Sequence, residues 1–449
     1  MTKKKTTAIV LAAGLGTRMK SALPKVLHPL AGRPMIGHLM ETLEIAGFDK
    51  TVVVTASGMD DVAAAVGPHP CVIQQEQLGT AHAVLAARDH LDGFDGEVVV
   101  LYGDTPLITV ETLHALLAAR RGPDNPAVVV LGFRPDDAGA YGRLILDQGG
   151  HLNAIVEARE ATDGQLKIDL CNSGVMALDG AVLLGILNRI GNDNAKGEYY
   201  LTDAVALARE DGRTCAYVEG DVSELTGVNS RAELAVAEEI VQERLRASAM
   251  ANGATLLDPK TVWFSFDTRL GRDVTIGPNV FFGPGVVVAD NVEVRAFSHL
   301  EGATLEEGAV VGPFARLRPG ARVGKDARVG NFVEVKNATI ETGAKVNHLS
   351  YVGDARVGAK ANIGAGTITC NYDGFSKSHT DIGAGAFIGS NTALVAPVSV
   401  GDGAIIGAGS VIAEDVGVDS VALTRATHKE VKGGAKRIRN RKTREKGKS

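Results

Sequence analysis

Two hydrophobic patterns divide the chain, and the first is a series of short apolar runs. In the N-terminal half, runs such as TTAIVLAAG, KTVVVTAS, EVVVLYGD and PAVVVLGF alternate with helix-like segments such as ETLHALLAARR. Strand-length apolar runs between amphipathic helices indicate a mostly parallel sheet that is covered on both faces. We therefore predict an α/β domain of the doubly wound type, Rossmann-like in outline, whose ligands lie at the carboxyl ends of the strands.

Near position 229 the pattern becomes that of one long helix. The segment NSRAELAVAEEIVQERLRASAMANG has Asn229 or Ser230 as N-cap, glutamates in its first turns and Gly253 as a stop signal. We expect an α/β domain over residues 1–228 and a linker helix over residues 229–252.

Beyond this helix a six-residue repeat takes over. Aliphatic or similar residues recur at Ile276, Phe282, Val288, Val294, Leu300, Leu305, Val311, Leu317, Val323, Val329, Val335, Ile340, Val346, Val352, Val357 and Ile363, often with a small residue next. Steps of five replace steps of six only at 300–305, 335–340 and 352–357. Such hexapeptide repeats are typical of a left-handed parallel β-helix, in which six residues make one flat face and three faces make a coil. We predict this fold over residues 253–427.

One interruption breaks the hexapeptide repeat. The segment CNYDGFSKSHT separates Ile363 and Thr369 from Ile382, after which the repeat continues in phase to Ile412. A surface loop that leaves the coil and returns in phase costs the core little. We therefore predict a functional loop here.

Composition and charge narrow the class of protein. The 449 residues are 45% hydrophobic and only 4% aromatic, and no run of about 18 apolar residues indicates a membrane span. The start MTKKKTTAIVLAAG is interpreted as a first strand rather than a signal peptide, because its apolar run is short and leads into a glycine-rich turn. Four scattered cysteines fit a reducing cytoplasm. The tail from His428 to Ser449 carries ten Lys or Arg and two Glu; without aromatic residues it is predicted to be a disordered, solubilising tail rather than a specific nucleic-acid binder.

The loop after the first strand carries the first candidate chemistry. LAAGLGTRMKSALPKVLHPLAG has Met19 where a dinucleotide fingerprint needs its third glycine, and it contains no P-loop Lys-Ser/Thr pair. Gly14 and Gly16 are followed by Arg18 and Lys25. Backbone N–H groups of a glycine turn together with two cations suit the binding of more than one phosphate group.

These features resemble the sugar nucleotidyltransferases, in which an LAAG-x-GTR loop and a Pro-Lys pair serve this purpose. Further matching segments are LYGDTPL, QQEQLGTAHA, YGR, IVEARE, CNSG and TGVNSR. The resemblance implies that Asp104 and Asn229 hold Mg²⁺, that Gln74, Gly79 and Thr80 read uracil, and that Gly142, Glu157 and Asn172 grip the sugar. It also implies that Leu11, Ala12, Ala13, Gly14, Tyr102 and Gly103 contact the nucleotide or sugar, and that Arg18 and Lys25 assist attack of a sugar-1-phosphate on the α-phosphorus of UTP.

Polar residues in the β-helix point to a second reaction. FARLRPG contains Arg318, NFVEVKN contains Glu334 and Lys336, and KVNHLSYVGDA contains His348 and Tyr351. His348 lies about one coil from the two cations, so we expect all three in one neighbourhood. Two cations suit a sugar phosphate, and a neutral imidazole suits removal of a proton from an attacking amine.

From the first strand to about Arg425, the chain resembles the bacterial bifunctional enzymes that combine glucosamine-1-phosphate N-acetyltransferase with N-acetylglucosamine-1-phosphate uridylyltransferase. This resemblance implies that His348 is the acetyl-transfer base, oriented by Glu334, and that Arg318, Lys336, Tyr351, Asn362 and Lys377 bind glucosamine-1-phosphate. Contacts to acetyl-CoA are implied for Ala365, Asn371, Tyr372, Ser390, Ala408 and Arg425. It further implies a homotrimer with acetyl-transfer sites between neighbouring chains, and a place in peptidoglycan and lipopolysaccharide synthesis. The segments CNSG and VNHL depart from the commoner Asn-Thr-Gly and Ala-Gly-His-Leu without removing a named group.

Two alternatives remain beside the bifunctional enzyme. The first alternative is a single-activity nucleotidyltransferase whose β-helix only regulates or oligomerises. The second is a scaffold protein with a decayed α/β domain. Lys25 and Asp104 in the N-terminal half disfavour the scaffold. His348 with Arg318, Lys336 and the CNYDG loop favours a second activity in the β-helix over a purely structural one.

Overall fold

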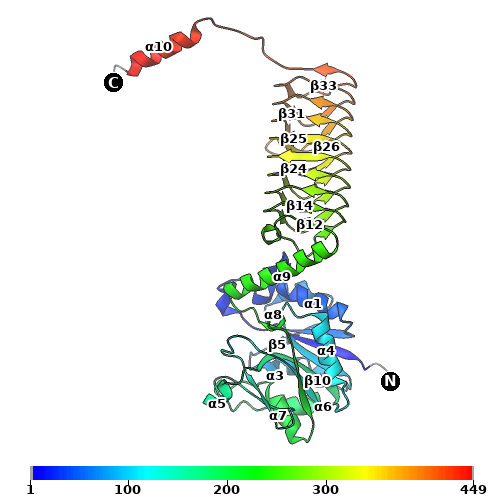
Figure 1. Cartoon of the computed structure of the whole chain (residues 1–449), viewed down its shortest axis with the longest axis vertical. Coiled ribbons are helices and arrows are strands. Elements are labelled where there is room, and N and C mark those ends of the chain that lie inside the picture. The colour runs from blue at the N-terminus through cyan, green and yellow to red at the C-terminus, as the bar shows by residue number, and fades with distance from the viewer. Residues whose placement is uncertain (1–3, 447–449) are drawn as a thin grey trace. The chain divides into compact units, whose positions relative to one another are not determined.

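The computed structural model describes residues 4–446 and divides the chain into two compact units, Met1–Leu245 and Arg246–Ser449 (Figure 1). Within the described residues, no helix is both long and apolar enough to cross a membrane.

A mixed sheet forms the centre of the N-terminal unit. Its strands lie in the order β11-β7-β10-β6-β1-β4-β5, and β8 and β9 form an antiparallel pair beside β10. The strands are β1 (Thr6–Leu11), β4 (Lys50–Ala56), β5 (Cys71–Gln74), β6 (Glu97–Tyr102), β7 (Val128–Phe133), β8 (Arg143–Leu146), β9 (Leu152–Val156), β10 (Cys171–Asp179) and β11 (Cys215–Glu219), with a short separate pair β2 (Pro29–Leu30) and β3 (Arg33–Pro34). β1 is parallel to β4 and β6, whereas β10 is antiparallel to β6 and β7. The predicted α/β fold is confirmed; the reversed strand was not predicted, because apolar periodicity carries no strand direction.

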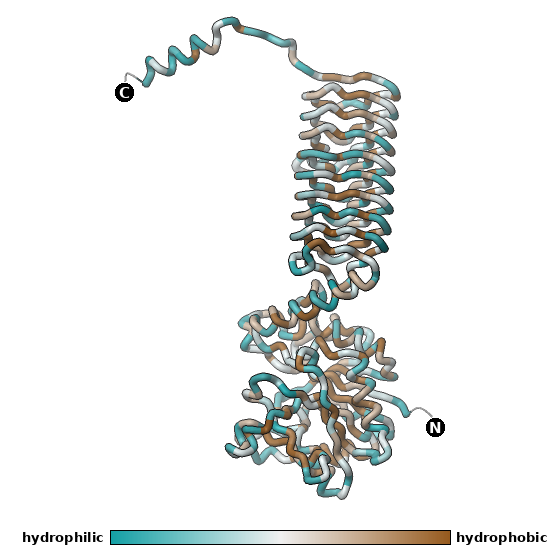
Figure 2. The backbone as a smooth tube through the Cα atoms, viewed as in Figure 1, coloured by the Kyte–Doolittle hydropathy of each residue, from teal (hydrophilic) through white to brown (hydrophobic). Residues whose placement is uncertain are grey.

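Helices cover both faces of this sheet. They are α1 (Met35–Ile45), α2 (Asp60–Val66), α3 (Thr80–Ala86), α4 (Val110–Arg120), α5 (Asp163–Leu166), α6 (Gly180–Leu187), α7 (Asp203–Glu210) and α8 (Val222–Leu225), with 3-10 turns at Thr17–Met19, Lys25–Leu27 and Arg88–His90. Ile9 belongs to a core that includes residues of α3, α6 and α7, and the next residue, Val10, belongs to a second core with α1, α2 and α4. Figure 2 shows these apolar segments inside the unit. The strands are apolar throughout because alternate residues pack into two separate cores, one on each face of the sheet.

The predicted long helix is α9 (Arg231–Ala251). The Ser230 hydroxyl accepts a hydrogen bond from the Glu233 N–H at 3.2 Å, so Ser230 is the N-cap, and the Glu233 carboxylate accepts from the Asn229 N–H at 2.7 Å. Ala237 and Val241 pack in a small core with Leu30, Met35, Leu107 and Val228. The cap therefore fixes the backbone of Asn229, one of the predicted site residues.

The C-terminal unit is a parallel β-helix, as predicted (Figure 1). One face consists of β12 (Thr255–Leu256), β14 (Thr275–Ile276), β17 (Glu293–Val294), β20 (Val310–Val311), β23 (Arg328–Asn331), β25 (Lys345–His348), β27 (Asn362–Ile363), β30 (Phe387–Ile388), β33 (Ile405–Ile406) and β35 (Val421–Ala422). The other faces consist of β13 (Arg269–Leu270), β15 (Phe281–Phe282), β16 (Val287–Val288), β18 (His299–Leu300), β19 (Thr304–Leu305), β21 (Arg316–Leu317), β22 (Arg322–Val323), β24 (Glu334–Ile340), β26 (Tyr351–Val357), β28 (Ile368–Cys370), β29 (Thr380–Ile382), β31 (Ala393–Val395), β32 (Val398–Val400) and β34 (Val411–Ile412). A 3-10 turn at Pro259–Thr261 precedes them.

The hexapeptide positions predicted from the sequence point inward. Ile276, Val294 and Val311 are each fully buried, and each is the second residue of its short strand. Thr275 pairs with Glu293, one ordinary coil later, whereas Glu293 pairs with Val310 after a coil shortened by one residue. That shortened coil contains the step of five at 300–305, so the irregular steps are local deletions that the stacking absorbs.

The predicted loop after Cys370 is a compact hairpin. Asn362 in β27 pairs with Phe387 in β30, so this coil is several residues longer than its neighbours. Tyr372 and Lys377 form an isolated antiparallel bridge, and the Asp373 carboxylate accepts from the N–H groups of Phe375 and Ser376 at 2.8 and 2.7 Å. The loop is therefore held in a defined shape by its own hydrogen bonds.

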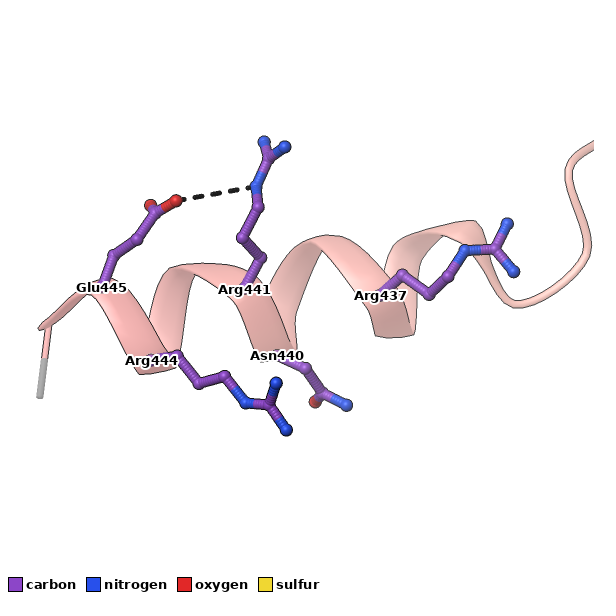
Figure 3. A pocket seen from close by; sticks show the side chains of 5 residues that line it. All are labelled: Arg437, Asn440, Arg441, Arg444 and Glu445. Atoms are coloured by element: carbon purple, nitrogen blue, oxygen red, sulfur yellow. Dashed lines mark ion pairs between the residues drawn. The ribbon is translucent and has the colours of Figure 1, made fainter.

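The basic tail differs from the sequence prediction of disorder. The structure has helix α10 (Gly434–Lys446), whose described residues are exposed or nearly so. Lysine and arginine are good helix formers, and Glu445 lies 3.7 and 3.9 Å from Arg441 and Lys442, one turn earlier. Figure 3 shows the side chains spreading away from this helix. The shallow hollow among them is lined by residues of α10 alone, so we do not interpret it as a binding site.

Candidate functional site

Lys25, Asp104 and Asn229 meet at the carboxyl ends of the parallel strands. The Lys25 ammonium forms an ion pair with the Asp104 carboxylate, and it donates to the side-chain oxygen of Asn229 at 3.0 Å. Asp104 follows β6, and its backbone oxygen accepts from the Val228 N–H at 2.8 Å, which brings the segment before α9 against it. Three residues far apart in the sequence thus converge on one point.

The same point suits a small divalent cation. Mg²⁺ prefers oxygen ligands and is commonly held by one or two protein oxygens, with substrate phosphates and waters completing the shell. The Asp104 carboxylate and the Asn229 carbonyl oxygen both lie within bonding reach of one atom, the Lys25 Nζ, so they are close enough to share an ion. Across residues 4–446, His, Cys, Asp and Glu form no group of three that could bind a metal by themselves.

A cavity of about 280 Å³ opens beside this cluster. Its lining includes the predicted residues Leu11, Ala12, Ala13, Gly14, Lys25, Gln74, Gly79, Thr80, Tyr102 and Asp104, and in addition Val26, Gln77, Ala83 and Glu198. Gly103 lies behind it, where its N–H donates to the Leu11 carbonyl at 2.9 Å. The sequence motifs for nucleotide binding therefore surround one cavity.

A second cavity of about 580 Å³ shares Thr80, Tyr102 and Glu198 with the first. It is lined by the predicted residues Arg18, Glu157 and Asn172, and by Ala140, Ala158, Arg159, Glu160, Ala195, Lys196, Tyr200 and Thr202, which were not predicted. The Asn172 N–H donates to the Gly142 carbonyl at 2.8 Å, so this pair joins the cavity wall to β8. Arg18 lines the larger cavity and Lys25 the smaller one. The two cations predicted to bind phosphate therefore lie in different cavities.

Burial changes the acidity of two groups in the second cavity. Burial, reinforced by Asp104 and Glu157, raises the pKa of the Tyr102 hydroxyl above its usual range. Burial also raises the pKa of the Glu157 carboxyl, although the Thr202 hydroxyl, at 3.4 Å, opposes this. A carboxylate with so few donors around it is a good acceptor for sugar hydroxyl groups.

The turn before α3 is pinned to a distant segment. The Ala81 N–H donates to the Tyr199 carbonyl at 2.9 Å, and the Thr80 hydroxyl accepts from the Leu201 N–H at 2.9 Å. Gly79 has a φ of 116°, and a Cβ there would lie 2.5 Å from the Tyr199 oxygen. Only glycine fits this position. The two hydrogen bonds hold the turn, which lines the smaller cavity, against the segment at Tyr199 and Leu201.

Three cations gather on one side of the β-helix. Arg318 donates to the Glu334 carboxylate at 2.8 Å, with Arg316 at 3.8 Å from the same group. The neighbouring ammonium of Lys377, helped by Arg318, lowers the pKa of Lys336. Lys377 belongs to the hairpin after Cys370, so the hairpin places a cation beside Lys336, which lies in an earlier coil. Like charges held together in this way suit a phosphate group.

His348 has a defined side-chain partner, and it is not the predicted one. Its Nδ1 lies 2.8 Å from the Asn331 side-chain oxygen in the preceding coil, where β23 and β25 pair Asn331 with His348. The hydrogen bond and ion pairs of Glu334 in the described residues run instead to Arg318 and Arg316. Asn331 precedes His348 by 17 residues, the length of one shortened coil, so counting one coil back from His348 would have identified it.

Three of the predicted acetyl-CoA residues, Ala365, Ser390 and Ala408, share one corner of the β-helix with His348. The His348 backbone oxygen accepts from the Gly366 N–H at 3.3 Å, that of Ala365 from Asn391 at 2.8 Å, and that of Ser390 from Gly409 at 2.8 Å. His348, Ala365, Ser390 and Ala408 therefore occupy the same corner in successive coils. Arg425 lies close to this corner. A Cβ placed on Gly407, the residue before Ala408, would be 3.5 Å from the Arg425 guanidinium.

The remaining predicted residues have structural partners. Asn371 is 8% exposed and donates to the Asp354 carboxylate, which also accepts from Asn337 at 2.6 Å. Tyr372 donates to the Gly374 carbonyl at 2.6 Å. Tyr351 begins β26 beside Glu334, and Asn362 begins β27 beside Lys345. Asn371 thus anchors the hairpin, while Tyr351 and Asn362 lie in coils adjacent to the cation cluster.

Comparisons with known proteins find family matches in both units of the chain. Residues 8–162 match the MobA-like NTP transferase domain, and residues 267–302 and 379–414 match the bacterial transferase hexapeptide family, which fits a left-handed β-helix. The chain is 63% identical to the bifunctional protein GlmU of Paramagnetospirillum magneticum over 448 residues, which cover 100% of both chains. It is 67% identical to the bifunctional protein GlmU of Rhodospirillum rubrum over 97% of both chains, and 58% identical to that of Azorhizobium caulinodans over 98% of both.

Proposed function

The chain belongs to the bifunctional GlmU family, and from this premise we propose which of its residues carry out each reaction. The enzyme transfers an acetyl group from acetyl-CoA to glucosamine-1-phosphate, and then a uridylyl group from UTP to N-acetylglucosamine-1-phosphate with release of pyrophosphate. Its product, UDP-N-acetylglucosamine, feeds peptidoglycan and lipopolysaccharide synthesis. The four unpaired cysteines agree with a cytoplasmic location for both reactions.

Uridylyl transfer is proposed for the two joined cavities of the N-terminal unit. The smaller cavity holds the nucleotide, with its phosphates beside Lys25, and the larger one holds the sugar, with its hydroxyl groups toward Glu157 and Asn172. Mg²⁺ held by Asp104 and Asn229 supplies positive charge to the phosphates when it is bound. Lys25 and Arg18 neutralise phosphate charge from two sides, and the turn at Gly79 and Thr80 fixes the base. The reaction needs no covalent nucleophile, so orientation and charge neutralisation account for most of the rate.

Acetyl transfer is proposed for the corner of the β-helix that carries His348. Because Asn331 presents an oxygen, which only accepts, the proton of the neutral ring lies on Nδ1, and Nε2 keeps the lone pair. Nε2 can therefore take a proton from the amine of glucosamine-1-phosphate as this attacks the thioester carbonyl. Arg318, Lys336 and Lys377 hold the phosphate, and the corner at Ala365, Ser390 and Ala408 offers small side chains along which acetyl-CoA can lie.

The assignment rests on one observation: the groups suited to each reaction lie in different units. The Asp104 and Asn229 oxygens that suit a metal are in the N-terminal unit, and the His348 imidazole is in the β-helix. Glucosamine-1-phosphate, acetyl-CoA, UTP and Mg²⁺ together should yield UDP-N-acetylglucosamine. Removal of divalent cations with EDTA should stop pyrophosphate release, while acetylation of glucosamine-1-phosphate, measured by free thiol, continues. Equal loss of both activities on chelation would contradict the assignment of the metal to one site.

A homotrimer is proposed from a column of exposed apolar side chains. Phe297, Phe314 and Phe332 stack at centroid distances of 4.9 and 5.2 Å, and Leu349 continues the column in the next coil. These four residues are 45% to 60% exposed, and all have left-handed φ values between 49° and 59°, which bulky residues rarely adopt. An apolar column kept at unfavourable backbone positions and left uncovered suits burial against other copies of the chain. Because Leu349 follows His348, that contact would adjoin the acetyl-transfer site.

The substitution Phe314→Glu should break this contact. A charge in the middle of the stack cannot be buried without a large penalty, so we expect the trimer to dissociate and acetyl transfer to fall at least about tenfold. Mass photometry together with the thiol assay measures both effects. Phe375→Glu is the control, since Phe375 is 95% exposed at the tip of the hairpin and should leave the trimer intact. An unchanged trimer in Phe314→Glu would exclude this column as the contact.

A further inference from the structure

We propose that His82 is a positioning residue that sets the nucleobase specificity of uridylyl transfer by fixing the side-chain amide of Gln74. Gln74 ends β5, is 3% exposed and lines the smaller cavity. Its Nε2 donates to the Gly79 carbonyl at 3.1 Å and lies 3.1 Å from Nδ1 of His82, in the first turn of α3. The inference rests on the proposed function in one respect, namely that Gln74 faces the base.

The Gly79 carbonyl determines which way the amide points. A carbonyl oxygen only accepts hydrogen bonds, so the Gln74 atom beside it must be the NH₂ group. One of the two hydrogens goes to Gly79, and the other is directed at His82. His82 Nδ1 must therefore accept this hydrogen bond, with the ring hydrogen on Nε2.

With both hydrogens of the amide engaged, its carbonyl oxygen is the polar atom left for the cavity. Uracil presents an N–H donor at N3, whereas cytosine presents an acceptor at the same position. An amide oxygen accepts from the first and repels the lone pair of the second. A fixed Gln74 therefore favours UTP over CTP, while an amide free to rotate would serve both bases.

His82 is itself held in place. Two hydrogen bonds, made by Ala81 and Thr80, hold the turn that begins α3 against the segment at Tyr199 and Leu201. The His82 ring lies 6.3 Å from the Tyr199 ring, at an interplanar angle of 32°. The imidazole is thus held in place before the nucleotide binds. Its effect on the cavity is indirect, because it contacts Gln74, which lines the cavity.

The test compares His82→Leu with His82→Asn in the full-length enzyme. Leucine removes the acceptor, and we expect the KM for UTP to rise about fivefold, the ratio of kcat/KM for UTP over CTP to fall about fivefold, and kcat at saturating UTP to stay unchanged. Asparagine places an oxygen near the position of Nδ1, so His82→Asn should bring the UTP to CTP ratio back to within about twofold of the parent enzyme.

Two further variants make the outcome decisive. His114→Leu, an exposed histidine of α4, is the matched control and should leave both constants unchanged. Gln74→Ala should reduce the UTP to CTP ratio more than His82→Leu does. If Gln74→Ala changes the ratio and His82→Leu does not, or if His82→Leu impairs UTP and CTP equally, the role of His82 is wrong. If Gln74→Ala leaves the ratio unchanged, the assignment of Gln74 to the base is wrong as well.

Discussion

Replacing His348 with alanine is expected to lower acetyl transfer to glucosamine-1-phosphate by about 10²- to 10⁴-fold, the usual contribution of a general base. The amine of the substrate must lose a proton as it attacks acetyl-CoA, and Nε2 of His348 can accept that proton when Nδ1 donates to the Asn331 oxygen, 2.8 Å away. Uridylyl transfer should be unchanged, since its residues lie in the other unit. Release of free thiol and of pyrophosphate, measured on one preparation, separates the two effects.

Asn331→Ala supplies the graded control for this experiment. The imidazole remains, but the tautomer and the ring orientation are no longer fixed, so a decrease of about tenfold in kcat is expected. His299→Ala, a histidine of β18 that stacks on Phe281 at 4.8 Å, should leave acetyl transfer unchanged. Full acetyl transfer in His348→Ala would overturn the assignment of the base. Glu334→Gln separates the two candidate orienting residues: if Glu334 acts through Arg318, the KM for glucosamine-1-phosphate should rise while kcat changes little.

The β-helix was predictable because its signal is periodic and repeated. Each repeat of six buries an aliphatic residue at the same position, so single irregular positions do not obscure the pattern. Even the shortened coils were visible as steps of five. The order of coils also follows from the sequence, which is why Arg318 and Lys336 could be placed close together. The pairing of His348 with Asn331 was missed because the resemblance supplied Glu334 as a partner, and the coil register was not applied to that pair.

The two cavities of the N-terminal unit were predicted less completely, for a different reason. The glycine turn, Lys25 and Asp104 stand at the ends of strands, where the apolar pattern stops, so their place at the edge of the sheet follows from the fold. Glu198, Tyr200 and Thr202 come from an irregular segment between α6 and α7 and carry no motif. Their approach to the cavity depends on the hydrogen bonds of Tyr199 and Leu201 with the turn before α3, and such long-range contacts leave no local pattern.

Asp104→Asn is expected to reduce uridylyl transfer by about 10²- to 10³-fold while acetyl transfer stays at the parent level. The change keeps the shape of the side chain and its backbone hydrogen bond with Val228 but removes the negative charge that faces Lys25. A neutral amide holds a divalent cation far less well than a carboxylate does. Asp92→Asn, at an exposed position after the turn Arg88–His90, is the control and should leave pyrophosphate release unchanged.

The dependence on Mg²⁺ distinguishes a metal ligand from a residue that only positions Lys25. If Asp104 binds the ion, higher Mg²⁺ concentrations should partly restore pyrophosphate release in Asp104→Asn, because weaker binding can be offset by mass action. Lys25→Met removes the ammonium and leaves both oxygen ligands in place, so its loss of activity should not respond to Mg²⁺ in this way. Equal responses of the two variants would show that Asp104 acts through Lys25 alone. Undiminished uridylyl transfer in Asp104→Asn would refute both roles, since Asp104 is the carboxylate that the fold brings to this point with Lys25 and Asn229.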